Sequence, residues 1–159
     1  MSALSADVVP VDVEATFASL ELPALPIAAR RARNFVGDFL HSWSEDEDRI
    51  EAAVVIVSEL VTNAIRHGDQ PLAGKRRRRR WPGTVIVLAM TLQADALFIE
   101  VRDDSPLVPV PREPADGDES GRGMAIVDAL ADSVVICLNF DGGKTVTTML
   151  RRTPSIHFG

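Results

Sequence analysis

The sequence predicts an α/β two-layer sandwich, in which a mixed, mainly antiparallel sheet is covered on one face by helices. Three observations lead to this fold class. Residues 96–103 alternate between apolar and polar side chains, which is typical of a strand with one buried face. Residues 44–68 carry apolar side chains at helical spacing. A glycine-containing turn at residues 141–143 separates two short apolar runs and predicts a closing hairpin.

The composition is that of a globular domain with a genuine core. The chain has 159 residues, of which 46% are hydrophobic and 25% charged. We interpret residues 1–10 as a disordered leader, 11–152 as one domain and 153–159 as a C-terminal tail. No apolar run approaches the ~18 residues that span a bilayer, and no secretory signal is evident. The single cysteine, Cys137, indicates a reducing compartment, so we expect a cytoplasmic protein in which this thiol packs inside an apolar strand.

Local signals define the first half of the domain. Val11–Leu22 alternates loosely and predicts an edge strand, and the prolines that follow introduce a helix over Ile27–Trp43. Ser44 with Glu47 three residues later forms a capping-box pattern, which predicts the start of the second helix at Ser44. Gly68 ends that helix.

The second half is predicted to contain four strands and one helix. The strands alternate in character and are separated by turn residues, whereas the helix follows two glycines and shows apolar residues at helical spacing. In order, these elements are strands at Thr84–Thr91 and Ala96–Asp103, a helix at Gly123–Ala131, and strands at Ser133–Phe140 and Lys144–Leu150.

A run of six basic residues, Lys75–Arg80, stands out from a chain whose net charge is −6. Such a block repels itself and is expected to stay extended unless an acidic group meets it. Three interpretations remain open: a solvated loop, a contact for an acidic protein partner, and a nucleic-acid contact. Nucleic acid comes last, because there is a single patch and the remainder of the chain is acidic.

Glu59 and Asn63 form the most informative pair in the sequence. Residues four apart are neighbours on a helix surface, so this spacing offers a carboxylate and an amide together beside an apolar stripe. That combination suits Mg²⁺, which takes few protein oxygens and leaves its other positions to water and phosphates. The alternative is that both side chains simply face solvent.

Two further elements fit the same chemistry. Asp103 shares the apolar face of its strand, so we expect it to point inward, where the amino group of a purine would be a suitable donor. The alternative is a surface Asp that opens a turn with Asp104 and Ser105. Gly121 and Gly123 precede a helix whose N-terminus would suit a phosphate, although an ordinary helix entry would look similar.

Together and in this order, the three elements resemble the histidine-kinase-like (GHKL, Bergerat-fold) ATPase domains. Within that superfamily the chain is similar to the small bacterial anti-sigma factor serine/threonine kinases. Residues 59–67 match the N-box, Asp103 matches the adenine-binding Asp of the first glycine box, and residues 121–124 match the second glycine box. The resemblance covers nearly the whole chain, from about Phe17 to Leu150.

The resemblance implies a role for each matching residue. Glu59 is the candidate general base, Asn63 binds Mg²⁺, and Asp103 accepts a hydrogen bond from the adenine amino group. Ser105 stands where many members have Gly, and the proline-rich segment 104–120 falls at the position of the ATP lid. The remaining binding residues are Gly121, Arg122, Gly123 and Met124 at the lid and phosphate-binding helix. Lys144-Thr145 resembles a late position near the phosphates or adenine, with Thr145 as the expected binding residue.

The resemblance also implies the function. We expect an ATP- and Mg²⁺-binding regulatory protein that phosphorylates an anti-sigma factor antagonist, with a sigma factor as the alternative binding target and a homodimer left open. The alternatives are a non-catalytic nucleotide- or partner-binding module and an ATP hydrolase without a protein substrate. His67, at the end of the N-box helix, is interpreted as a cation that complements the helix dipole rather than as a metal ligand.

Overall fold

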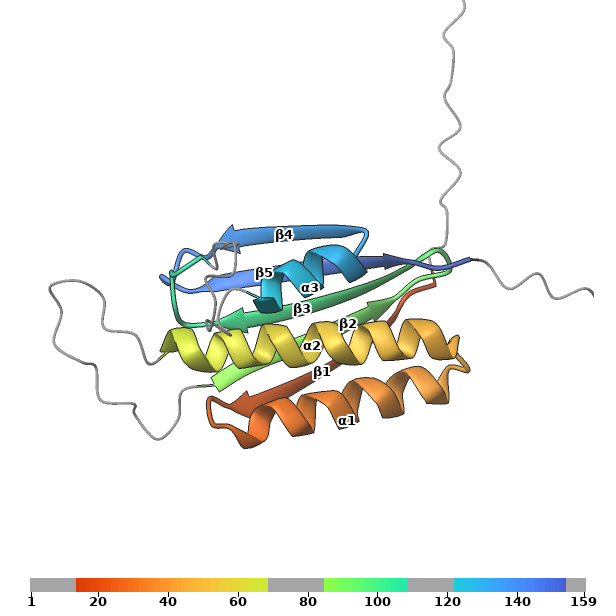
Figure 1. The fold of residues 1–159 in the computed structure, drawn as a ribbon, viewed down its shortest axis with the longest axis horizontal. Helices are drawn as coiled ribbons and strands as arrows, with labels where there is room; N and C mark the ends of the chain where they lie inside the picture. Colours follow the sequence, from red (N-terminus) through yellow and green to blue (C-terminus); the bar gives the residue numbers. More distant parts are fainter. Residues whose placement is uncertain (1–13, 69–84, 109–121, 154–159) are drawn as a thin grey trace, which may run out of the picture.

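A computed structural model describes residues 14–68, 85–108 and 122–153 (Figure 1). The predicted leader, the Lys75–Arg80 run, Gly121 and most of the segment at the lid position lie outside these residues. The described elements, in chain order, are β1 (Thr16–Pro23), α1 (Ile27–Ser42), α2 (Glu47–Gly68), β2 (Val85–Leu92), β3 (Ala96–Asp103), α3 (Arg122–Leu130), β4 (Ser133–Leu138) and β5 (Lys144–Arg151).

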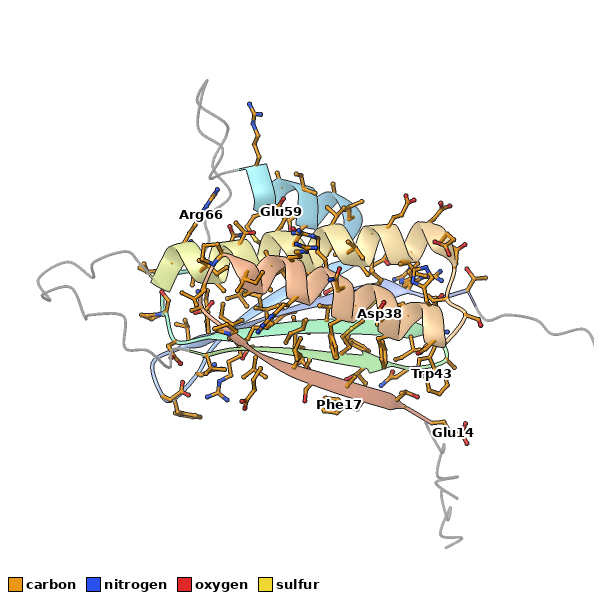
Figure 2. The ribbon with its side chains drawn as sticks, turned by 90° about the horizontal axis from the view of Figure 1, so that it is seen from below. Glu14, Phe17, Asp38, Trp43, Glu59 and Arg66 are labelled. Atoms are coloured by element: carbon orange, nitrogen blue, oxygen red, sulfur yellow. The ribbon has the colours of Figure 1, made fainter. Side chains whose placement is uncertain are left out.

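The strands form one open sheet in the order β1-β2-β3-β5-β4, and the three helices lie on one side of it (Figure 2). The two-layer α/β prediction is therefore confirmed. The prediction of a mixed sheet is wrong in one respect, because all four pairings between the described strands are antiparallel. For β1 and β2 the reason lies in the connection: α1 runs back along the sheet and α2 returns, so β2 begins at the end of the sheet where β1 finishes and runs antiparallel to it (Figure 1).

The core lies between the sheet and the helices. Alternate residues of β2 and β3 are buried, and α1 contributes a stripe of buried residues spaced by four. Each fully buried Leu, Ile or Met side chain stabilises the fold by about 1.5–3 kcal/mol relative to an exposed one. Among the described residues, no helix is both long and apolar enough to cross a bilayer.

The connection between α1 and α2 corrects the predicted helix start. Ser44 has a positive φ of 51°, and its N–H bonds the carbonyl of His41 while the Glu45 N–H bonds that of Leu40. This pair of bonds is a Schellman motif, which satisfies the last carbonyls of α1. Ser44 therefore ends α1 instead of capping α2, which begins at Glu47.

Glu45 holds this connection against the far end of the sheet. Its carboxylate is nearly buried and binds the guanidinium groups of Arg49 and Arg152, the latter through Nε at 2.6 Å. Arg152 also bonds the carbonyl of Gln93 in the β2–β3 turn. Burial would raise the pKa of the Glu45 carboxyl, but the Asp46 N–H and the two guanidinium groups outweigh it and lower the pKa below its ordinary value of 4.5.

Replacing Glu45 with Gln should lower the free energy of unfolding at pH 7 by about 1–3 kcal/mol, because two partly buried guanidinium groups lose their counter-charge. Since the folded-state pKa is lowered, this contribution is complete above pH 4.5 and disappears as the pH falls through the folded value. Urea unfolding at pH 7 and pH 3 should therefore show a difference between the proteins that shrinks in acid. Asp38→Asn, at an exposed position on α1, is the control; an identical difference at both pH values would contradict the assignment.

Candidate functional site

Glu59 and Asn63 lie on the flank of α2, beside the stripe that packs on the sheet. That stripe consists of apolar residues at helical spacing, including Val57, Leu60 and Ala64, all of which are buried. Glu59 and Asn63 are half-buried and one helical turn apart. The predicted pairing of carboxylate and amide on one stripe is thus present, and it is not a freely exposed surface.

The Glu59 side chain lies against the first turn of α3 (Figure 2). A Cβ atom added at Gly123 would overlap Glu59 Oε2 and would lie 3.3 Å from Cδ. Gly123 and Met124 are buried, whereas Arg122 is exposed at the helix start. The structure therefore brings Glu59 together with the described part of the second glycine motif, at a helix N-terminus whose free N–H groups suit an anion.

Asp103 points inward at the end of β3, as the alternation predicts, and its residue is only 5% exposed. It is not an open carboxylate. The Ser105 N–H donates to Oδ1 at 2.8 Å, and the Lys144 ammonium lies 2.9 Å from each of Oδ1 and Oδ2. Lys144 also donates to the Ser105 carbonyl at 3.2 Å. A buried ion pair thus occupies the position expected to receive a purine amino group.

Lys144, which the resemblance places together with Thr145 near the phosphates or adenine, is the partner of Asp103 in this ion pair. It is the first residue of β5, directly opposite Asp103, and it is 2% exposed. The strand alternation contained the signal, because Lys144 shares its face with Val146, Thr148 and Leu150, all of which are buried. A Lys is rarely buried unless it is paired, and Asp103 supplies the counter-charge here.

Thr145 lies apart from this cluster. It follows Lys144 in β5 and therefore faces the other side of the sheet, where its hydroxyl bonds the Asn139 side chain at 3.2 Å and 3.3 Å. Directly opposite it on β3 is Arg102, which is exposed. The structure does not bring Thr145 together with Glu59, Asn63 or Asp103.

His67 approaches the same cluster from the end of α2. Burial lowers the pKa of its imidazole, the Lys144 ammonium lowers it further, and the Asp103 carboxylate opposes the shift. The neutral form is therefore favoured near pH 7, so the expected cation at the helix end is wrong. Within the described residues, its buried Nδ1 atom has no hydrogen-bond partner.

Cys137 also departs from expectation, since its side chain is exposed instead of packed. It lies opposite Thr145 on β4, a strand at the edge of the sheet, and shares the face that turns away from the helices. The apolar run Val134–Leu138 correctly predicted a strand. The face that carries Cys137 is exposed because the helices cover the opposite face of the sheet.

Gly143 fixes the β4–β5 turn against the end of β3. A Cβ atom there would overlap the carbonyl oxygen of Asp103 and would lie 3.1 Å from the Cα atom of Asp104. Both are backbone atoms, which cannot rotate aside as the end of a side chain can. The close approach of Gly143 therefore sets the position of Lys144 relative to Asp103.

Gly143→Ala should lower the free energy of unfolding by about 1–3 kcal/mol, because the added methyl group forces the backbone of β3 and the turn apart. Gly37→Ala is the matched control: a Cβ atom at this α1 position meets nothing within 4 Å, and Ala is the better helix former by about 0.5–1 kcal/mol. Thermal or urea unfolding compares the two. Equal stability of the two variants would contradict the close approach.

Comparison with known proteins places this arrangement in context. A structural match is found with the RsbU and RsbW domains of Rv1364c from Mycobacterium tuberculosis, with 25% sequence identity and a TM-score of 0.62. The match covers 87% of this chain and 33% of that one, so the chain spans about a third of its length. No match is found among curated proteins.

A family of domains also matches most of this chain. Residues 22–151 match the histidine kinase-like ATPase domain, a range that includes every described residue of the candidate site. The predicted resemblance to the GHKL superfamily is confirmed by this match. The chain belongs to the histidine kinase-like ATPase domain family.

Proposed function

We propose that this chain is an ATP-binding regulatory protein that transfers the γ-phosphoryl group of ATP to a serine or threonine of a partner protein. The contact between Glu59 and the first turn of α3 is the observation that carries the proposal. It places a half-buried carboxylate, the candidate base, beside backbone N–H groups that suit a phosphate. Family membership supports the ATP-binding half of the proposal.

Phosphoryl transfer needs mainly positioning and charge stabilisation, and little covalent chemistry from the protein. Glu59 would orient the incoming hydroxyl and accept its proton, while the N-terminus of α3 would favour the charge on the phosphates. The two groups come from different helices that pack directly on each other, so their separation is fixed by the core and not by a loop.

The described residues fit a magnesium ion that is bound chiefly by ATP. They contain no group of three or more His, Cys, Asp or Glu side chains that could hold a metal on its own. Mg²⁺ is usually held by one or two protein oxygens together with water and substrate phosphates, and Asn63 would supply one such oxygen. The ion, when bound, neutralises charge on the phosphate oxygens.

An anti-sigma factor antagonist is the protein substrate that we propose, with a sigma factor as the alternative binding target. The resemblance to small anti-sigma factor kinases supports this choice. The similarity to a structure that contains an RsbW domain supports it further.

A second candidate function, a partner-binding module without catalysis, is favoured by one observation. The carboxylate that would recognise adenine is already bound by Lys144 on both of its oxygens. A chain whose base-recognition group is satisfied internally could keep the fold and its partner surface without turning over ATP. Catalysis and nucleotide binding must therefore be measured separately.

Glu59→Gln separates the two functions, because the amide keeps the size and hydrogen bonding of the side chain but cannot accept the proton. In a kinase, the affinity for ATP should stay within about threefold while phosphoryl transfer falls by about 10²-fold or more. Transfer of label from radioactive ATP to a candidate antagonist, with nucleotide affinity from calorimetry, gives both quantities. Glu51→Gln, on the exposed side of the same helix, is the control; equal transfer rates for both variants would remove Glu59 from the mechanism.

Asn63→Ala should abolish the dependence of ATP binding on Mg²⁺ while leaving thermal unfolding nearly unchanged, because the side chain contributes an oxygen ligand and little core packing. Calorimetry with ATP, with and without Mg²⁺, measures the difference. Asn34→Ala, at an exposed position on α1, is the matched control. An unchanged Mg²⁺ effect in Asn63→Ala would exclude this residue as a ligand.

A further inference from the structure

The ammonium group of Lys144 is fully satisfied inside the protein. A lysine has three N–H donors and no acceptor. In this structure they face Asp103 Oδ1 and Oδ2, each at 2.9 Å, and the Ser105 carbonyl at 3.2 Å. The side chain is 2% exposed and that of Asp103 is 6% exposed, so water takes little part in the arrangement.

The Asp103 carboxylate is correspondingly occupied. Oδ1 accepts from both Lys144 and the Ser105 N–H, and Oδ2 accepts from Lys144. An ammonium is a stronger donor to a carboxylate than the neutral amino group of a purine, because both partners of the bond are charged. A purine amino group that approaches Asp103 therefore competes with a better donor that is covalently part of the chain.

We propose that Lys144 is an internal competitor for the purine subsite at Asp103 and thereby sets a low affinity for adenine nucleotides. The inference rests on the proposed function, in which Asp103 accepts from the adenine amino group. An adenine nucleotide then binds only when Lys144 gives up at least one of its bonds to the carboxylate. The rest of the nucleotide, including its phosphates, is not affected by this competition.

The backbone around Lys144 keeps the competitor in place. Lys144 is paired with Asp103 on one side and Leu138 on the other, and the preceding Gly143 packs on the Asp103 carbonyl. Only the side chain can therefore swing away. If the Lys144 ammonium moved away from Asp103, the nearby His67 imidazole would face a carboxylate without its counter-charge. The competition is thus intramolecular and always present.

Removing the ammonium tests the proposal directly. In Lys144→Met, a side chain of similar length carries no donor, so Asp103 keeps the Ser105 N–H and gains room for the adenine amino group. The affinity for ATP·Mg²⁺, measured by calorimetry, should rise by about 10- to 100-fold, the value of one hydrogen bond to a charged group. The affinity for ITP·Mg²⁺ should change by less than about threefold, because hypoxanthine carries an oxygen in place of that amino group.

Two controls separate the subsite from general charge effects. Lys144→Arg retains a cation beside Asp103 and should show no gain for ATP. Arg102→Met removes the exposed cation of the residue before Asp103, which faces the other side of the sheet. This variant should leave the affinities for ATP and ITP unchanged. An equal gain for ATP and ITP in Lys144→Met would overturn the proposal, because the effect would then act on the phosphates.

Loss of the counter-ion could also prevent Lys144→Met from folding on its own. Refolding in the presence of ATP·Mg²⁺ or ITP·Mg²⁺ then provides the readout: rescue by ATP alone supports the proposal, and equal rescue or no rescue overturns it. If wild type binds ATP and Lys144→Met binds it no better, only this inference fails. If neither the wild type nor any variant binds ATP or ITP, the proposed function fails together with it.

Discussion

The packing of α2 on the sheet fixes where the site residues lie. Its buried stripe, which includes Val57, Leu60 and Val61, determines the rotation of the helix about its axis. That rotation turns Glu59 toward α3 and brings the helix end near Asp103. A helix rises 1.5 Å per residue, so the eight steps from Glu59 to His67 span about 12 Å. One helix thus connects the contact with α3 to the surroundings of Asp103.

Much of this architecture could be predicted from local patterns. Alternation identified β3 and the inward direction of Asp103, and helical spacing identified α2, because both patterns follow from one covered sheet face. Ser44 was misread because the capping box and the Schellman motif compete for the same residue. Cys137 was misread because an apolar strand does not reveal which of its faces the helices cover. Both errors arise because the outcome depends on tertiary contacts, which a short stretch of sequence does not contain.

The sequence indicates the candidate site residues one by one but not the contacts between them. Glu59 and the α3 start were found as separate motifs, yet their contact depends on the absence of a side chain at Gly123. The burial of Lys144 and its pairing with Asp103 were not predicted, because both depend on strand register, which cannot be read from one sequence. A register error of one residue on a strand moves a side chain to the other face of the sheet.

The ion pair of Asp103 and Lys144 is costly to bury, and it lies at the position that we propose for the adenine amino group. Desolvating two charges can exceed their attraction, so such pairs add little stability compared with apolar residues of similar volume. Removing either partner alone is far worse, because it leaves an uncompensated charge. The pair of Asp103 and Lys144 is therefore stable only as a unit, and a ligand that separates it must replace the lost interaction. Under the proposed function, nucleotide binding is therefore coupled to the state of this pair.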